Sequence, residues 1–459
     1  MSLLPAVRYL KSLPAVRHRS QSVYALAEQA QLRHFTLDAA KIPTIAALVL
    51  RLIQRDHGTV SQVPTHGRWR SYITHSPGPG ASRDLISEHI AKWQAAGVDS
   101  WECARRVIDL FVVSVLIDAG AGSAWEYQDA EIGALTRTEG LGMAALRMFE
   151  RGCFSSSPEG NVFQADAEAL KALADEDVLQ GFQVSESNPL LGVSNRAELL
   201  RRLGMALDQG KYFKDPQEGG VDGPARPGFM LDYLASLHPS AAHNQEEDRR
   251  EVDIEEIWEV IIEGFAPVWP SSRTQLGGES LGDVWPCPTL QPTATTVDSP
   301  TLSADPSILV PFHKLSQWLT WSLLEVIVRL GGFTVTRTEL LTGLPEYRNG
   351  GLFVDLGVLT LNDSDRKRGL EHPLATGGVP LFDGSDPVIV EWRALTVCLL
   401  DRVAEIIKKE CCAEGEVPEM FLGRILEGGT WKAGREVAAE KRPLSKDPPI
   451  NIVSDGTLF

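Results

Sequence analysis

The sequence is poor in the residues and patterns that bind metals, form disulfides or cross membranes. It has only six cysteines in 459 residues, and none forms a CxxC pair or stands at zinc-ligand spacing from a histidine. No apolar run approaches the ~20 residues that a membrane-spanning helix needs. Scattered cysteines are typical of reduced thiols in a reducing compartment. We therefore expect a cytoplasmic protein with no metal and no membrane partner.

The common cofactor and nucleophile motifs are also missing. The chain contains no GxSxG elbow, no GxxxxGK[ST] phosphate loop, no HExxH and no GxGxxG after a strand. The pairs Gly331-Gly332 and Gly350-Gly351 are too few to hold a pyrophosphate. A net charge of −17 argues against a nucleic-acid partner, which requires a basic surface. We expect no cofactor and no nucleic acid.

The first 27 residues leave one alternative compartment open. They carry Arg8, Lys11, Arg17 and Arg19 and no acid, a composition typical of a mitochondrial transit segment. Two prolines, Pro5 and Pro14, interrupt a helix there, and the segment continues without a break into an apolar periodic run. We expect the cytoplasm and keep mitochondrial import as the alternative.

The apolar residues are spaced mainly as in helices. With 43% apolar and 23% charged residues the chain can bury a large core. Spacings of three and four predict helices over 20–34, 41–55, 86–97, 101–118, 139–151, 165–179, 195–209, 251–265 and 388–409. Only 333–336 and 352–361 alternate as strands do. The sequence therefore predicts a mainly α fold.

We expect one helical domain over residues 1–459 rather than several. Polar segments rich in glycine and proline near 210–250 and 270–306 are predicted to be loop insertions, with disorder at 238–250 and 287–306. Apolar helices on both sides of each segment can share one core. The apolar residues 450–453 near the end predict a tail that docks back onto the body.

The stretch 310–359 is the main candidate for a site. Its first half predicts a helix with one apolar face made of Leu315, Leu319, Leu323, Val326 and Leu330. The opposite face carries Lys314, Trp318, Trp321 and Glu325, an unusual set for a solvated surface. The second half packs Pro345, Glu346, Tyr347, Arg348 and Asn349 and two glycines into a turn. Charged, glycine-rich turns between rigid elements often carry chemistry.

Several carboxylates have apolar or aromatic neighbours, and they are Asp118, Glu139, Glu325, Glu346, Asp355 and Glu391. Asp118 ends a buried helix just before Trp125. Carboxylates beside aromatics suit hydrolysis of a glycosidic bond, because one can stabilise an oxocarbenium-like state or activate water. The alternative is structural: each acid forms a buried ion pair, for example with Arg348 or Arg393, or, for Asp118, bonds nearby backbone amides.

Long blocks of the sequence resemble a known family. They are SVYALAEQAQLRHF, HGRWRSY, SVLIDAGAGSAWEY, TRTEGLGMAALRMFERGCFSS, FQVSESNPLLG, LVPFHKLSQWLTWSLLE and LTGLPEYRNGGLFVDLGVL. Together they resemble the fungal and bacterial uracil-catabolism family called URC4 or Urg3, over nearly the whole chain. The resemblance implies a role in pyrimidine degradation, through ribosylurea-type intermediates.

The order of blocks is also similar, more distantly, to that of the queuosine-salvage nucleotide N-glycosylases, which have a helical, DNA-glycosylase-like fold. Their Phe-Tyr-Lys-Arg-Ala-Gln block is matched by Phe312, His313, Lys314 and Gln317, and their Ala-Asp-Tyr-Arg turn by Pro345, Glu346, Tyr347 and Arg348. Two further features of these enzymes are matched as well. Their aspartate followed by an aromatic cluster after a buried helix is similar to Asp118 with Trp125, and their later Glu-x-Arg is similar to Glu391 with Arg393. Glu346 replaces a catalytic aspartate and Leu315 an arginine, which puts an identical mechanism and phosphate contact in doubt.

These observations predict an N-glycosidic hydrolase that releases urea from a small-molecule riboside or ribotide, ribosylurea or its 5-phosphate. The predicted catalytic residues are Glu346 and Asp118. The predicted substrate-binding residues are Lys314, His313, Trp318, Arg348, Tyr347, Trp125, Asp355, Glu391 and Arg393. Two alternatives stay open. One is a non-catalytic protein that binds a pyrimidine-derived riboside, and the other is a hydrolase that opens the ureide, for which the expected metal or cysteine site is missing.

Overall fold

A computed structural model describes residues 4–75, 82–122, 124–157, 162–209, 211–215, 224–238, 250–270, 273–291, 305–411 and 417–453. The chain divides into two compact units, each assembled from segments far apart in sequence. Unit 1 contains Met1–His66, Ser271–Gln317 and Thr338–Val453, and unit 2 contains Gly67–Pro270, Trp318–Arg337 and Ser454–Phe459. The units are therefore described one at a time, and the single domain over 1–459 stays a prediction.

Helices dominate both units, so the predicted mainly α class is confirmed. The helices of unit 1 are α1 (Leu4–Leu10), α2 (Leu13–Glu28), α3 (Ile42–His57), α13 (Tyr347–Asp355), α14 (Asp363–Leu370), α15 (Pro387–Cys411), α16 (Phe421–Ile425), the π-helix η9 (Leu426–Thr430) and α17 (Trp431–Lys441). Its strands are β1 (Phe35–Leu37), β7 (Gln275–Leu276), β8 (Glu279–Ser280), β9 (Val284–Pro286), β10 (Leu309–Pro311), β12 (Leu359–Leu361), β13 (Leu381–Phe382) and β14 (Asn451–Ile452).

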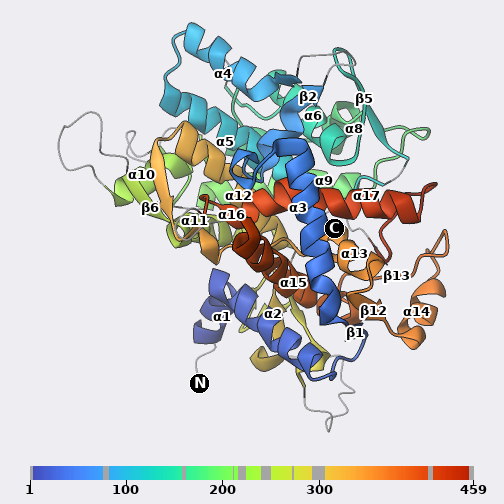
Figure 1. The fold of residues 1–459 in the computed structure, drawn as a ribbon. Coiled ribbons are helices and arrows are strands. Elements are labelled where there is room, and N and C mark those ends of the chain that lie inside the picture. The colour runs from blue at the N-terminus through green and yellow to red at the C-terminus, as the bar shows by residue number, and fades with distance from the viewer. Residues whose placement is uncertain are drawn as a thin grey trace. The chain divides into compact units, whose positions relative to one another are not determined.

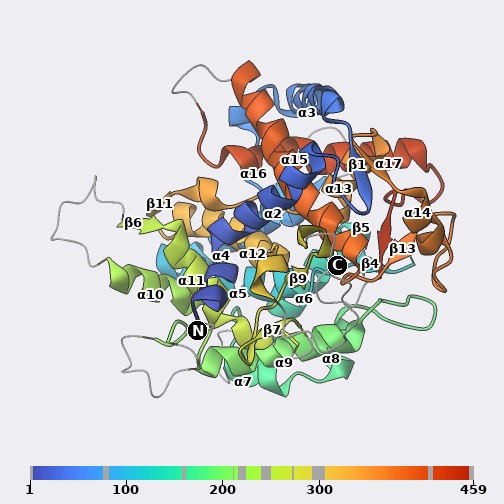
Figure 2. The same ribbon diagram turned by 90° about the horizontal axis from the view of Figure 1, so that it is seen from below.

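The long helix α15 forms the centre of unit 1. Helices α2 and α3 both pack against it, and Figures 1 and 2 show them beside α15 at an angle to its axis. Its first turn begins at Pro387, which suits a helix start, and its last turn carries Lys408 and Lys409, which suit the negative end of the helix dipole. Every residue from Val388 to Leu400 is buried. The helix predicted for 388–409 is confirmed.

The C-terminal segment of unit 1 returns to the body, as predicted. Strand β14 pairs in parallel with β13, aligning Asn451 with Leu381 and Ile452 with Phe382. Ile450 is buried at 1% exposure. The tail is thus held by backbone pairing and by one apolar anchor.

Two predictions in unit 1 are wrong in detail. The strand expected over 352–361 is the helix α13 followed by the short strand β12, which pairs antiparallel with β1. The side chain of Glu346 caps α13, a local bond that overrides the strand-like alternation that follows. The helix expected over 20–34 runs instead from Leu13 to Glu28, because Pro14 stands in its first turn, where proline is tolerated.

Unit 2 is also helical. Its helices are α4 (Leu85–Ala95), α5 (Ser100–Leu116), α6 (Arg137–Glu150), α7 (Ala167–Ala172), α8 (Asp175–Gly181), α9 (Val193–Gln209), α10 (Met230–Leu237) and α11 (Ile254–Gly264). Its strands are β2 (Ile73–His75), β3 (Ser82–Asp84), β4 (Glu126–Asp129), β5 (Gly133–Thr136), β6 (Arg250–Asp253) and β11 (Phe333–Thr336). Helix α12 (Lys314–Arg329) begins in unit 1 and supplies its residues from Trp318 onward to unit 2.

Helix α5 is buried along Val107–Leu116, as its apolar sequence predicts. The helix expected over 165–179 is divided into α7 and α8 by a break at Leu173, which has an extended ψ of 121°. Strand β11 confirms the prediction for 333–336 and pairs in parallel with β6.

The predicted loop insertions contain short ordered elements where they are described. Residues 210–250 include the helix α10, and residues 270–306 include β7, β8 and β9. Most of the disorder predicted at 238–250 and 287–306 lies outside the described residues. The described parts are residues 238, 250, 287–291 and 305–306. Arg250 begins β6, and the segment 287–291 forms a short 3-10 helix with the buried Cys287 and Thr289.

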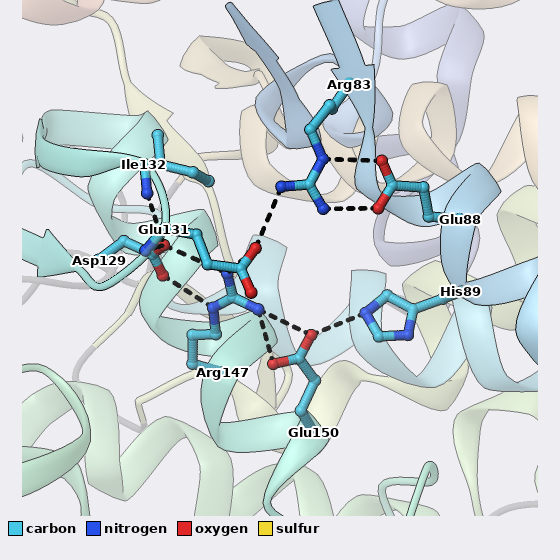
Figure 3. A network of polar contacts seen from close by, with 8 residues as sticks. All are labelled: Arg83, Glu88, His89, Asp129, Glu131, Ile132, Arg147 and Glu150. Carbon is cyan, nitrogen blue, oxygen red and sulfur yellow. Dashed lines mark hydrogen bonds and ion pairs between the residues drawn. The ribbon is translucent and has the colours of Figure 1, made fainter. Parts of the chain in front are cut away.

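A network of charged side chains joins α4, α6 and the β4–β5 hairpin of unit 2 (Figure 3). Arg147 on α6 bonds Asp129 on β4 at 2.7 Å and Glu150 at 2.9 Å. Glu150 also bonds His89 on α4 at 2.7 Å. Burial would raise the pKa of the Glu150 carboxyl, but its bonds to His89 and Arg147 lower it overall. The network therefore holds these elements together by charge as well as by packing.

Candidate functional site

A buried ion pair in unit 1 brings together the two halves of the candidate stretch. Arg393 on α15 donates two hydrogen bonds to the Asp283 carboxylate, at 2.8 and 2.7 Å. Both side chains are almost completely buried. The Arg393 Nε also donates to the Pro345 carbonyl at 3.3 Å, and its guanidinium lies over the Phe312 ring at 4.1 Å. The residues before α12 and before α13 are thereby fixed to one arginine.

Asp283 completes this arrangement from a third segment. Its carboxylate accepts from the Lys314 backbone N–H at 2.9 Å and from the Trp285 indole at 2.6 Å. Burial alone would raise the pKa of the Asp283 carboxyl, but the Arg393 guanidinium and these donors hold it well below its usual range. Asp283 therefore stays ionised and positions the first residue of α12.

Sequence reasoning missed Asp283. It lies in the segment 270–306, which was predicted to be an insertion, and its partner stands 110 residues away. No periodic pattern or local motif links two such residues. The nearest signal is Arg393, which the family resemblance had already selected.

Glu346 caps the first turn of α13. Its carboxylate accepts from the backbone N–H groups of Arg348 at 2.7 Å and Asn349 at 2.5 Å. This is an ordinary N-cap arrangement, which by itself stabilises a helix. The residue nevertheless keeps part of its surface accessible.

The pKa of the Glu346 carboxyl is raised. Burial is the main cause, and it is opposed by the two backbone hydrogen bonds and by the positive charges of Arg348 and Lys314. A carboxyl with a raised pKa can exchange a proton closer to neutral pH than an ordinary glutamate. Glu346 is thus partly accessible, surrounded by protein and flanked by two cations.

His313 and Lys314 lead into α12. His313 is buried and adopts a left-handed φ of 46°, a conformation that side chains rarely take. Its Nε2 donates to the Leu10 carbonyl at 2.8 Å, and burial lowers the pKa of its imidazole. Because that proton already has an acceptor, His313 holds α1 to the start of α12 in this structure. Its predicted role in substrate binding stays a prediction.

Arg348, Tyr347 and Asn349 form the first turn of α13 behind Glu346. Arg348 is only 5% exposed, lies over the Tyr347 ring at 4.9 Å and donates to the Lys446 carbonyl at 3.1 Å. The Asn349 amide donates to the Leu344 carbonyl at 3.0 Å. The polar side chains of the turn are therefore held by backbone groups of unit 1.

The other two predicted acids of unit 1 have structural partners. Asp355 at the end of α13 forms a two-point ion pair with Arg442, with bonds of 2.8 and 2.5 Å. Glu391 is fully buried and accepts from the backbone N–H groups of 33–35 at 3.0–3.2 Å and from the Thr289 hydroxyl. It fixes the approach to β1 against α15.

Asp118 lies in unit 2, at the end of α5. Its carboxylate pairs with the fully buried Arg68 at 2.9 Å. The nearby Arg196 donates to the carbonyls of Ile117, Ala119 and Gly120 and so caps the same helix end. Burial lowers the pKa of Arg196 to about 10, and the charge of Asp118 partly offsets this.

The predicted aromatic residues also belong to unit 2. Trp125 is 1% exposed and its indole donates to the Phe182 carbonyl at 2.9 Å, as a core tryptophan would. Trp318 is half-buried, and Trp321 on the same helix is 1% exposed. Glu325, the last residue of that face, accepts from Arg70 at 2.6 and 2.7 Å. Roles for these residues in ligand binding stay predictions.

The described residues contain no group of three or more His, Cys, Asp or Glu that could hold a metal ion. None of the described helices is long and apolar enough to span a bilayer. A feature of unit 1 that is suited to chemistry is thus the Glu346 carboxyl, whose pKa burial raises and the charges of Arg348 and Lys314 lower. The fold and this site define a mainly α-helical protein with a partly accessible carboxyl near two cations.

Comparisons with known proteins give the family. The family described as "Protein of unknown function (DUF1688)" matches residues 9–459. The chain is 39% identical to "Uracil catabolism protein 4" of Lachancea kluyveri over 463 residues, covering 99% of both chains. It is 40% identical to "Protein urg3" of Schizosaccharomyces pombe over 455 residues, again covering 99% of both. The chain therefore belongs to the DUF1688 family, which includes these uracil-catabolism 4 and Urg3 proteins.

Proposed function

We propose that this chain acts in uracil catabolism as an N-glycosidic hydrolase that releases urea from ribosylurea or its 5-phosphate. The pathway follows from the printed name of one relative, "Uracil catabolism protein 4", which covers the chain end to end. The reaction follows from the resemblance to nucleotide N-glycosylases at 312–317 and 345–348 and from the chemistry of the residues at those positions.

The observation that carries the proposal is the environment of Glu346. A general base works best when its pKa lies near the working pH, and burial raises the pKa of this carboxyl in that direction. Its partly accessible position leaves room for contact with water or substrate. The positive charges of Lys314 and Arg348 favour the ionised form of Glu346, which is the form that acts as a base.

In the proposed step, a water oxygen attacks C1′ of the sugar while the bond from C1′ to the urea nitrogen breaks. Glu346 accepts a proton from the water, and its negative charge stabilises the developing sugar cation. The departing urea nitrogen takes up a proton from the solvent, and Glu346 afterwards releases its proton to the solvent, so that one water is consumed and urea and the free sugar or its 5-phosphate leave. Asp283 and Arg393 position the first residue of α12 and the turn before α13.

Binding without turnover is the second candidate function. It is favoured by one observation: both Glu346 oxygens already accept backbone N–H groups, as a purely structural cap does. In that case the cations beside Glu346 would recognise a pyrimidine-derived riboside, and no bond would be cut.

The test is an assay of purified protein with ribosylurea, its 5-phosphate and a panel of nucleotides, measuring free urea and reducing sugar. We expect release from one of the ribosylureas and a loss of at least ~100-fold in Glu346→Gln, the lower range for a general base. Glu346→Asp keeps a carboxylate and a good cap and should retain part of the activity.

Asp99→Asn is the matched control. Asp99 is also an N-cap carboxylate, accepting from the Glu102 N–H at 2.7 Å, but it caps α5 in unit 2. It should leave turnover unchanged. Binding of a riboside with no urea release from any substrate would eliminate the hydrolase and leave the binding protein. Unchanged turnover in Glu346→Gln would move the catalytic role to Asp118 or Asp355.

A further inference from the structure

Arginines that are buried in this protein have their charge compensated, with one exception. Among the described residues, the arginines below 9% exposure are Arg68, Arg196, Arg226, Arg348 and Arg393. Three of them form ion pairs, with Asp118, Asp109 and Asp283. Arg196 has no such partner but donates to four carbonyl oxygens around the end of α5. Arg348 follows neither pattern.

The guanidinium of Arg348 is only partly satisfied by the protein. Its Nη1 donates to the Lys446 carbonyl at 3.1 Å, and the plane lies over the Tyr347 ring. None of the described residues accepts a hydrogen bond from its Nε or Nη2, and no described carboxylate forms an ion pair with it. Although the residue is 95% buried, its Nε and Nη2 are not among the buried polar atoms without a partner. This edge of the guanidinium therefore keeps some accessible surface and can receive an acceptor from outside the protein.

The carboxylate of the turn itself does not bind this edge. Glu346 lies close enough for the charge of Arg348 to lower its pKa, but its two oxygens accept hydrogen bonds from the backbone N–H groups of Arg348 and Asn349. Those same N–H groups would otherwise form the anion-binding end of α13. With Glu346 in place, these two N–H groups are occupied, and the Arg348 guanidinium offers a charged donor for an incoming anion.

We propose that Arg348 binds an oxyanion of the substrate, and that this oxyanion is a phosphate group. An arginine edge with two free donors matches a phosphate or a carboxylate by two parallel hydrogen bonds. This places an anion-recognition residue two positions after Glu346. The inference rests on the proposed function for its reaction, and it selects ribosylurea 5-phosphate over the neutral riboside.

In this assignment Arg348 recognises the phosphate, and its charge, like that of Lys314, also lowers the pKa of the Glu346 carboxyl. Tyr347 holds the guanidinium plane from one side, so its orientation exists before the anion arrives. Such preorganisation favours a bidentate bond over a loose charge contact.

The first experiment measures binding and needs no turnover. Inorganic phosphate is titrated into the full-length protein by calorimetry, with acetate as the carboxylate probe and chloride for ionic strength. We expect phosphate to bind more tightly than acetate, and Arg348→Gln to weaken phosphate binding by ~10-fold or more. Arg348→Lys keeps the charge but loses the two-point bond, so it should show an intermediate loss.

Arg435→Gln is the matched control. Arg435 lies over the Trp431 ring at 4.8 Å, much as Arg348 lies over Tyr347, and it is in the same unit. Its replacement should leave phosphate binding unchanged. Circular dichroism checks the fold of each variant. If Arg348→Gln does not fold, the loss of phosphate binding in Arg348→Lys is the result that decides.

The second experiment compares urea release from ribosylurea and from its 5-phosphate. We expect kcat/KM to favour the phosphate at least ~10-fold, and Arg348→Gln to remove that preference mainly through KM. Tighter binding of acetate than phosphate, or equal loss on both substrates, overturns the phosphate assignment. Phosphate binding that depends on Arg348 without any urea release supports the oxyanion site and contradicts the hydrolase, so the two failures are distinguishable.

Discussion

The pair between Asp283 and Arg393 gives the sharpest prediction of stability. Asp283→Asn keeps the size of the side chain but removes its charge and turns an N–H₂ group toward the arginine donors. The pair is buried, with side-chain exposures of 1% for Asp283 and 2% for Arg393. Removing one partner of a buried pair costs about 3–5 kcal/mol, because the other charge stays buried and unpaired. For a unit of this size that lowers the melting temperature by roughly 2–4 °C per kcal/mol.

The measurement is thermal or urea unfolding of the purified variant, with two controls. Asp401→Asn breaks a more accessible pair of the same unit, that with Arg17, whose side chains are 21% and 22% exposed, and it should cost about 1 kcal/mol or less. Combining Asp283→Asn with Arg393→Met removes both charges and should recover much of the loss. A destabilisation of Asp283→Asn below about 1 kcal/mol, similar to that of the exposed pair, would refute the reasoning.

The same pair predicts a pH dependence. Burial opposes ionisation of Asp283, but the effect of the Arg393 charge is larger and holds the pKa of Asp283 below its usual range in the folded state. The stabilisation is therefore complete above the unfolded-state pKa of about 3.9 and is lost as the pH falls below it. Wild-type stability should decline over that acid range, and the decline should be smaller in Asp283→Asn.

Three further predictions concern α13 and α15. Glu346 must be ionised to act as a base, and its pKa is raised, so we expect kcat/KM to fall as the pH drops through a value above the pKa of an ordinary glutamate. A pH profile of kcat/KM measures this, and the acid-side decrease should be absent in Glu346→Gln. Gly434→Ala should lose about 1–3 kcal/mol in urea unfolding, since a Cβ there would lie 2.2 Å from the Arg348 carbonyl oxygen; an unchanged midpoint would contradict the close approach of α17 to α13. Glu391→Gln keeps one acceptor for the 33–35 backbone and should lose about 1–3 kcal/mol in the same assay, whereas a neutral result would mean that these bonds add nothing.

The sequence predicts best where one local pattern decides the structure. The helix α15 was visible from its apolar spacing and its basic end, and the docking of residues 450–453 from an apolar run near the terminus. The stretch 352–361 was misjudged because its alternation looked like a strand, while the cap that starts a helix there is the carboxylate of Glu346. The Glu346 carboxylate thus decides the local backbone structure as well as offering a group for chemistry.

The sequence predicts only the part of the candidate site that has a local pattern. The turn 345–349 combines charge, an aromatic ring and glycines, so its residues stand out in the sequence alone. Asp283, which holds that turn's neighbours in place through Arg393, has no local signal, because its two partners are distant in sequence. Likewise, the unused donors of Arg348 appear only when each contact of the folded chain is counted.

The interleaved segments of the two units also dictate an order of events on the ribosome. All described residues of unit 2 have been made by Arg337, whereas α2 and α3 of unit 1 precede them and cannot pack on α15 until residues 387–411 exist. At ~5–20 residues per second, the apolar faces of α2 and α3 stay uncovered for on the order of tens of seconds. During that interval the nascent N-terminal helices expose apolar surface, which makes the incomplete chain prone to aggregation.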